Sequence, residues 1–200
     1  MSDSDLRTSE ASARRVCQIA PLQSGKGGDV LILHDSANNP VDPGSLDVLR
    51  KFDQAGINLV IATYTYGSQG VAQLKEIAGA ILEICTKEGL EKTVLAGYGR
   101  SATAIIYSLT GNVRGILGAI AIQPDPDEEV FSRLYSVAEP IWFLYSQASG
   151  TEVERAMFRY HDLTAGSRLL KVKGNANDIY IKRPSQFFSL VEDYINHAGT

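Results

Sequence analysis

Short apolar runs alternate with longer amphipathic segments along nearly the whole chain. Each run has the length of a buried strand, and the longer segments repeat their apolar residues at helical spacing. This alternation is typical of a mostly parallel sheet covered by helices on both faces. The expected strands are 15–20, 30–34, 57–63, 93–96, 115–122, 140–145 and 167–172, and the expected helices are 45–54, 71–87, 102–109, 128–137, 151–163 and 184–197. The sequence therefore predicts a three-layer α/β/α fold around a twisted, mostly parallel sheet of about seven strands.

A glycine-rich segment, 25–29, separates the first two expected strands. Because so short a connection usually joins antiparallel neighbours, 15–20 and 30–34 are predicted to pair with each other at one edge of the sheet. In open parallel sheets, ligands bind beyond the carboxyl ends of the strands. The loops that follow those ends are therefore the places to search for a site.

Composition and charge exclude several classes of function. A chain of 200 residues is predicted to form one domain, 14–200, after a flexible tail, 1–13. The net charge of −4 and the lack of a basic cluster argue against a nucleic-acid partner. No apolar run approaches the roughly 18 residues of a membrane span, and the polar start lacks the apolar part of a signal peptide. Cys17 and Cys85 have no metal-ligand spacing, so we expect a cytoplasmic protein without metal or cofactor.

The segment 97–101, Gly-Tyr-Gly-Arg-Ser, links an expected strand to an expected helix. Its outline is that of a nucleophile elbow, G-x-S-x-G, which presents a hydroxyl at the tip of a strained turn between a strand and a helix. In this chain the central position is Gly99, so the turn is kept and the hydroxyl is lost. Glycine also relieves the strain of such a turn and leaves space above it.

The element order resembles the α/β-hydrolase superfamily in its small, capless form, over roughly 15–198. The patches that carry the resemblance are VLILHD (30–35), GINLVIA (56–62), TVLAGYGRSA (93–102), VRGILGA (113–119), KGNAN (173–177) and RPSQF (183–187). They are similar, in that order, to the strand before the oxyanion loop, the strand before the long helix, the elbow, the strand after the elbow helix, the loop that bears the catalytic histidine, and the final helix. The resemblance implies an α/β-hydrolase fold.

The resemblance also implies that the catalytic triad is lost. The nucleophile position matches Gly99, the histidine position matches Asn177 or Asn175, and the acid is expected within 146–149, which contains no carboxylate. A hydroxyl nucleophile needs a base to take its proton and a third group to orient that base. Ser101 is a rival nucleophile if the elbow lies two residues later, and the alternative for Ser101 is a small residue at the start of a helix.

An oxyanion hole could survive the loss of the triad, because it is built from backbone N–H groups of Arg100 and of the loop after His34. The helix start at Arg100, together with its side chain, adds positive charge that suits an anionic or aromatic ligand. The predicted ligand-binding residues are His34, Asp35, Ser36, Tyr64, Tyr98, Gly99, Arg100 and Tyr145. A structural role is the alternative for His34, and the tyrosines are equally compatible with loops that they seal without binding a ligand.

Four acidic residues follow the expected strand 115–122. These are Asp125, Asp127, Glu128 and Glu129. Although such a group could suggest a cation site, negative charge at the start of a helix is favourable in itself. We interpret these residues as a loop and a helix N-cap.

Three functions are compatible with these residues. The first is a non-hydrolytic protein that binds a small organic ligand at the former active site, with or without lyase, cyclase or isomerase chemistry that needs no covalent intermediate. The second is a pseudoenzyme that serves as a catalytically inactive scaffold or regulatory partner, with a homodimer as one form. The third is a serine esterase that uses Ser101. The lost triad places the first ahead of the others.

Overall fold

A computed structural model describes residues 16–17, 28–35, 51–52, 54–64, 70–111, 113–176 and 179–198. The expected tail, 1–13, and most of the expected helix 45–54 lie outside these residues, and residues 51, 52 and 54 are helical as expected.

The described residues form a sheet of seven strands as the middle layer, in the order β1-β3-β2-β4-β5-β6-β7. The strands are β1 (Val16–Cys17), β2 (Asp29–Asp35), β3 (Asn58–Tyr64), β4 (Thr93–Tyr98), β5 (Ile116–Ile122), β6 (Ile141–Ser146) and β7 (Arg168–Val172). The six strands β2–β7 run parallel to their neighbours, and β1 is antiparallel to β3. The expected three-layer fold with a mostly parallel sheet is confirmed.

The expected pairing of the first two strands is wrong. The short strand β1 pairs with β3, with Val16 opposite Ala62, and makes no ladder with β2. Both edges of β2 are already used by parallel partners, because Leu33 lies opposite Ala62 of β3 on one side and opposite Gly97 of β4 on the other. Because β2 has no free edge for a hairpin partner, β1 pairs instead with the outer edge of β3.

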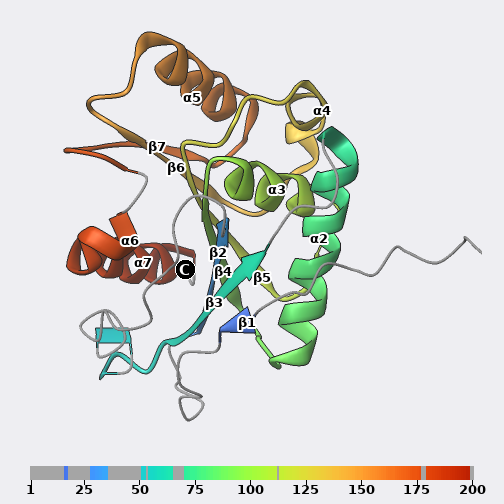
Figure 1. Ribbon diagram of the computed structural model, residues 1–200, viewed down its shortest axis with the longest axis vertical. Coiled ribbons are helices and arrows are strands. Elements are labelled where there is room, and N and C mark those ends of the chain that lie inside the picture. Colours follow the sequence, from blue (N-terminus) through green and yellow to red (C-terminus); the bar gives the residue numbers. More distant parts are fainter. Residues whose placement is uncertain are drawn as a thin grey trace, which may run out of the picture.

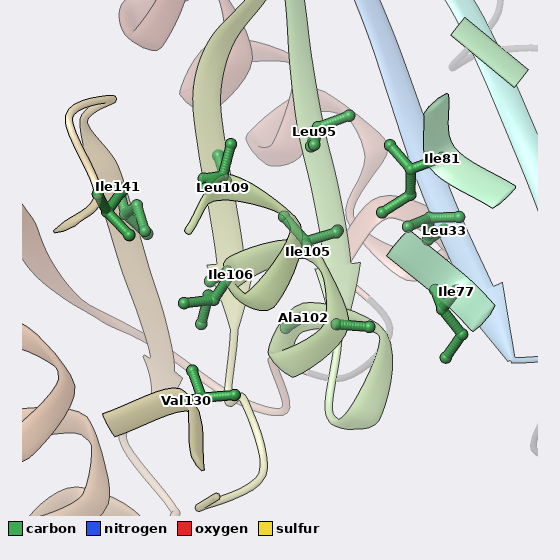
Figure 2. Packing of buried hydrophobic residues seen from close by; sticks show 14 of the residues in the cluster. Leu33, Ile77, Ile81, Leu95, Ala102, Ile105, Ile106, Leu109, Val130 and Ile141 are labelled. Carbon is green, nitrogen blue, oxygen red and sulfur yellow. The ribbon is translucent and has the colours of Figure 1, made fainter. Parts of the chain in front are cut away.

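Helices cover the two faces of the sheet, as Figure 1 shows. One face packs against α2 (Gly70–Lys87), α3 (Arg100–Leu109), α4 (Glu128–Phe131), the 3₁₀ turn η1 (Leu134–Ser136) and α5 (Thr151–Leu163). The other face packs against α6 (Ile179–Lys182) and α7 (Pro184–Ala198). We call these the α3 face and the α7 face. Figure 2 shows the α3 face, where apolar side chains of α2 and α3 gather against β2 and β4.

Two helices depart from the expected pattern. The expected helix 128–137 divides into α4 and η1, since the hydroxyls of Ser132 and Ser136 donate to the carbonyls of Glu129 and Arg133 and so compete with helical hydrogen bonding. The four-residue α6 has too few residues for a periodic signal and was not expected. None of the described helices is long and apolar enough to cross a membrane.

Candidate ligand site at the carboxyl edge of the sheet

Parallel pairing brings the carboxyl ends of the strands to one edge. Across this edge, Asp35 lies opposite Tyr64, Tyr98 lies opposite Ile122, and Ser146 lies opposite Val172. The loops after these residues were the expected location of a site. The structure therefore brings the ends of β2, β3 and β4, with His34 and the turn at Gly99, to the same edge of the sheet.

Gly99 forms the sharp turn between β4 and α3. Its backbone angles are φ 55° and ψ −125°, a combination that residues with a side chain rarely adopt. The turn is fixed on both sides, because Gly99 N–H donates to the carbonyl of Ile122 at 3.0 Å and the Gly99 carbonyl accepts from the N–H of Thr103 at 3.1 Å. The chain therefore has the strained strand-to-helix turn expected at 97–101, with its tip at a residue that has no side chain.

The helix after the turn packs directly onto the strand before it. A Cβ added to Gly97 would lie 2.9 Å from Ile105 Cδ1, 3.0 Å from Ser101 Cβ and 3.2 Å from Ala102 N. Ser101 is only 1% exposed and lies in this contact between strand and helix. The hydroxyl of Ser101 is thus held within the packing of α3, whereas the tip of the turn belongs to Gly99.

Arg100 begins α3, and its N–H is one of the helix-end groups with no acceptor inside the helix. Its side chain leaves the turn: Nε donates to Gln73 Oε1 at 3.0 Å, Nη1 to Asp127 Oδ2 at 2.9 Å and Nη2 to the Gly70 carbonyl at 2.8 Å. The expected positive charge for a ligand is therefore directed to a partly buried ion pair with Asp127. The backbone N–H is the Arg100 group that remains at the turn.

Asp125 comes close to the tip of the turn, which sequence reasoning missed. Its Oδ1 lies 3.6 Å from the position that a Cβ of residue 99 would occupy. Its backbone carbonyl accepts from the hydroxyls of Thr103 at 2.9 Å and Tyr160 at 2.7 Å. Partial burial raises the pKa of the Asp125 carboxyl above its ordinary value, and the nearby charge of Arg100 opposes that rise. The only signal in the sequence was that Asp125 follows the end of a strand.

Asp127 has the role expected of a helix cap. Its Oδ1 accepts from the N–H groups of Glu129 at 3.1 Å and Val130 at 3.3 Å, at the start of α4. The interpretation of the acidic segment as a loop and N-cap is confirmed, and the pair with Arg100 ties the cap to α3. Within the described ranges, no group of three or more His, Cys, Asp or Glu side chains is arranged to hold a metal ion.

His34 is buried near the end of β2 and contacts Tyr180 of α6. The distance between His34 Nδ1 and the Tyr180 hydroxyl is 2.5 Å, and the two rings meet edge to face. This contact fits the structural alternative for His34, because it joins the end of β2 to α6. Asp35 and Tyr64 end their strands side by side at the same edge, and Ser36 lies outside the described residues.

The two tyrosines at the ends of β4 and β6 differ in their surroundings. Tyr98 is half-buried and packs on the α7 face beside the turn. Tyr145 is buried on the α3 face, where its hydroxyl donates to Glu154 Oε1 of α5 at 3.3 Å and Lys171 lies over its ring. Tyr98 therefore borders the turn from the α7 face, whereas the hydroxyl of Tyr145 is directed to α5.

The loops after β6 and β7 are joined to each other. Ser146 Oγ donates to the Gly174 carbonyl at 2.5 Å and accepts from the N–H of Ala148 at 3.0 Å. The guanidinium of Arg183 donates to the carbonyls of Lys173 and Asn175. These contacts fix 173–175 through backbone carbonyls. Asn177, the preferred match for the histidine position, lies outside the described residues.

Several solved structures have the same arrangement of elements. A predicted CIB-like hydrolase from Thermoplasma acidophilum superposes with a TM-score of 0.69 at 17% sequence identity, covering 86% of this chain and 88% of that chain. An α/β hydrolase from the metagenome of lagoon sediments at Mar Chica, Morocco, has a TM-score of 0.71 at 13% identity, with 93% and 100% covered. Carboxylesterase CesB from Bacillus subtilis has a TM-score of 0.64 at 11% identity, with 92% of each chain covered. No family model and no curated protein matches the sequence.

Proposed function

Because the chain has the α/β-hydrolase fold, we propose that it is a non-hydrolytic protein of this fold that binds a small organic ligand above Gly99. The observation that carries this proposal is the conformation of Gly99, whose φ of 55° and ψ of −125° form the elbow without a hydroxyl at its tip. A fold that keeps the strained turn and lacks the nucleophile keeps the binding part of the site without the covalent step.

Hydrogen-bond donors support ligand binding at this place. The N–H of Arg100 begins a ten-residue helix, and the N-terminal end of a helix carries a partial positive charge. In working hydrolases, one donor of an oxyanion hole contributes about 3–4 kcal/mol to the transition state. The same donor can stabilise a developing enolate or phenolate, so proton-transfer chemistry of the lyase, cyclase or isomerase kind is compatible with this site.

The neighbourhood of the other two triad positions also supports a non-hydrolytic function. Ser146 stands at the end of β6, where the resemblance expects the acid to follow, and its hydroxyl is committed to Gly174 and Ala148. Arg183 holds the segment before Asn177 through backbone carbonyls. An esterase that uses Ser101 is disfavoured by the burial of that residue against Gly97.

Labelling and binding can be measured on the same protein. We expect a serine-reactive fluorophosphonate to leave the wild-type chain unlabelled, because no hydroxyl stands at the tip of the elbow and Ser101 is buried. We also expect titration with 4-nitrophenol or 4-nitrobenzoate to shift the amide NMR signals of Gly99 and Arg100. As the control, amides of α7 such as that of Asp193 should not move, because α7 covers the opposite face from α3.

Two results would contradict the proposal. Labelling that disappears in Ser101→Ala would establish the esterase. Unmoved signals of Gly99 and Arg100 with both compounds would favour the catalytically inactive scaffold.

A further inference from the structure

We infer that Asp125 determines which ligand the elbow accepts: a neutral hydroxyl donor, with a phenol as the simplest case, in preference to a carboxylate. The inference rests on the proposed ligand site above Gly99 and narrows its substrate class. It assigns to Asp125 a role in specificity that neither the element order nor the family resemblance indicates.

The carboxyl of Asp125 lies beside the tip of the elbow. With Oδ1 3.6 Å from the place of a Cβ on residue 99, its carboxyl borders the space into which a side chain of residue 99 would extend. A ligand that occupies this space would therefore lie beside the Asp125 carboxyl. Asp125 as a whole is an exposed residue, although its carboxyl is partly buried beside the turn.

The backbone holds Asp125 in this position. The hydroxyls of Thr103 and Tyr160 both donate to its carbonyl, at 2.9 and 2.7 Å. Two residues earlier, Gln123 has φ 42°, an uncommon value for a residue with a side chain, and its N–H donates to the Leu144 carbonyl at 2.8 Å. Backbone strain of this kind persists where surrounding contacts impose it, and it is frequent at functional sites. These contacts therefore fix the backbone of Asp125 beside the turn.

The guanidinium of Arg100 does not donate a hydrogen bond to the Asp125 carboxyl. Arg100 directs its guanidinium to Asp127, Gln73 and the Gly70 carbonyl. Among the described residues, no side chain or backbone group donates a hydrogen bond to the Asp125 carboxyl. The acceptor capacity of that carboxyl is therefore available to a ligand.

The chemistry of the two groups at the turn selects the ligand. An ionised carboxylate only accepts hydrogen bonds, and the Arg100 N–H only donates. A phenol hydroxyl does both, so it can donate to Asp125 and accept from Arg100 N–H, and a hydrogen bond to a charged acceptor is a strong one. A carboxylate ligand can satisfy Arg100 N–H only, and it would bring a second negative charge to Asp125, which disfavours its binding.

Other charged and titratable groups surround Asp125. These are Arg100 on α3, Asp127 before α4 and Tyr160 on α5. Arg100 lowers the pKa of Asp125 and partial burial raises it, with burial the larger effect. Burial raises the pKa of the Tyr160 hydroxyl, which stays a donor to the Asp125 carbonyl. The selection of a neutral donor therefore depends on the ionised form of Asp125 and weakens as pH falls through its raised pKa.

The test compares 4-nitrophenol with 4-nitrobenzoate, which share a ring and a nitro group and differ in the polar end. At a pH where Asp125 is ionised and the phenol is neutral, we expect the wild-type chain to bind 4-nitrophenol about tenfold more tightly, the factor that about 1.4 kcal/mol gives. Because Asp125 favours the protonated phenol, the absorbance of bound 4-nitrophenol should show its ionisation at a higher pH than in free solution.

Asp125→Asn keeps the shape of the side chain and removes its charge. We expect this variant to lose the tenfold preference and to bind the phenolate, so that the bound compound ionises at a lower pH than on the wild-type chain. Asp193→Asn, a matched change at an exposed position of α7, should leave both measurements unchanged.

The outcomes separate this inference from the proposed function. If 4-nitrobenzoate binds at Gly99 as tightly as the phenol, or if Asp125→Asn leaves the ratio unchanged, the inference is wrong and the ligand site stands. If neither compound moves the signals of Gly99 and Arg100, both proposals fail.

Discussion

Gly97 and Gly99 lie two residues apart and are required for different reasons. At Gly97 the constraint is space, because an added Cβ would meet the backbone nitrogen of Ala102 at 3.2 Å as well as two side-chain carbons. At Gly99 the constraint is conformation, since its φ is 55° while the nearest atom to an added Cβ is Asp125 Oδ1 at 3.6 Å. The elbow therefore needs a small residue on the strand and admits a side chain at its tip only with backbone strain.

Gly97→Ala should destabilise the fold by about 1–3 kcal/mol, because the methyl group overpacks a contact that includes the backbone. The free energy of unfolding in urea measures this change. Gly79→Ala on α2 is the matched control: nothing lies within 4 Å of its added Cβ, so the substitution should stabilise the protein by about 0.5–1 kcal/mol. A Gly97→Ala variant as stable as the wild type would show that α3 does not pack against β4 as closely as these distances indicate.

The residue pattern predicted the elbow and could not predict what lies over it. The glycines of 97–101 are visible in the sequence because a turn between strand and helix needs small residues there. The approach of Asp125 to Gly99 is a contact between two loops, set by Gln123 and by the hydroxyls of Thr103 and Tyr160. No periodic or local signal encodes a contact of this kind. The partners of the Arg100 side chain could not be predicted for the same reason, because they lie on other elements.

At the scale of elements, Arg100 joins three segments that are far apart in the chain. It begins α3, bonds to Gly70 and Gln73 in the first turn of α2, and pairs with Asp127, the cap of α4. The side chains of Arg100 and Asp127 are only 19% and 14% exposed, so their pair is screened less than a surface pair. These contacts of Arg100 therefore help to hold α3, and with it the elbow, against α2 and α4.

Arg100→Ala should lower the free energy of unfolding by about 1–3 kcal/mol, because it removes three hydrogen bonds and leaves Asp127 partly buried without its cation. Thermal or urea unfolding measures the loss. The control is Arg133→Ala, whose pair with Glu129 is 46% and 35% exposed and is expected to contribute about 0.5 kcal/mol. Equal effects of the two substitutions would contradict a structural role for Arg100.

Element order was predictable because buried parallel strands and amphipathic helices have distinct periods. The helix 151–163 and the strands around it lie within a residue or two of their expected bounds. Pairing at the sheet edge was not predictable, since Val16 lies opposite Ala62 across a long stretch of sequence. On α2, Leu82 and Ile84 are both apolar, yet Leu82 is 43% exposed and Ile84 is buried. The elements that pack against a helix determine which of its apolar side chains are buried, and the sequence of the helix alone does not specify those neighbours.

At the scale of the whole molecule, the sheet separates two apolar clusters. Ile106 belongs to the cluster of the α3 face, and Trp142, the only tryptophan of the chain, belongs to the cluster of the α7 face. The Trp142 ring lies 5.1 Å from the ring of Tyr194 on α7, centre to centre. Both clusters pack on the same strands, so neither face can lose its packing without affecting the sheet that supports the other.

The prediction of one domain over 14–200 can be tested through this arrangement. Ile106→Ala removes buried carbons from the α3 face and should cost about 2–5 kcal/mol. If the chain unfolds as one unit, the transition seen by Trp142 fluorescence on the opposite face should move as far as the transition seen by far-ultraviolet circular dichroism. Leu82→Ala, at an exposed position of α2, should change the free energy of unfolding from both fluorescence and circular dichroism by about 0.5 kcal/mol or less. A fluorescence transition that stays in place while the circular dichroism transition moves would show that the two faces unfold separately, and the sheet would then not form a single cooperative core.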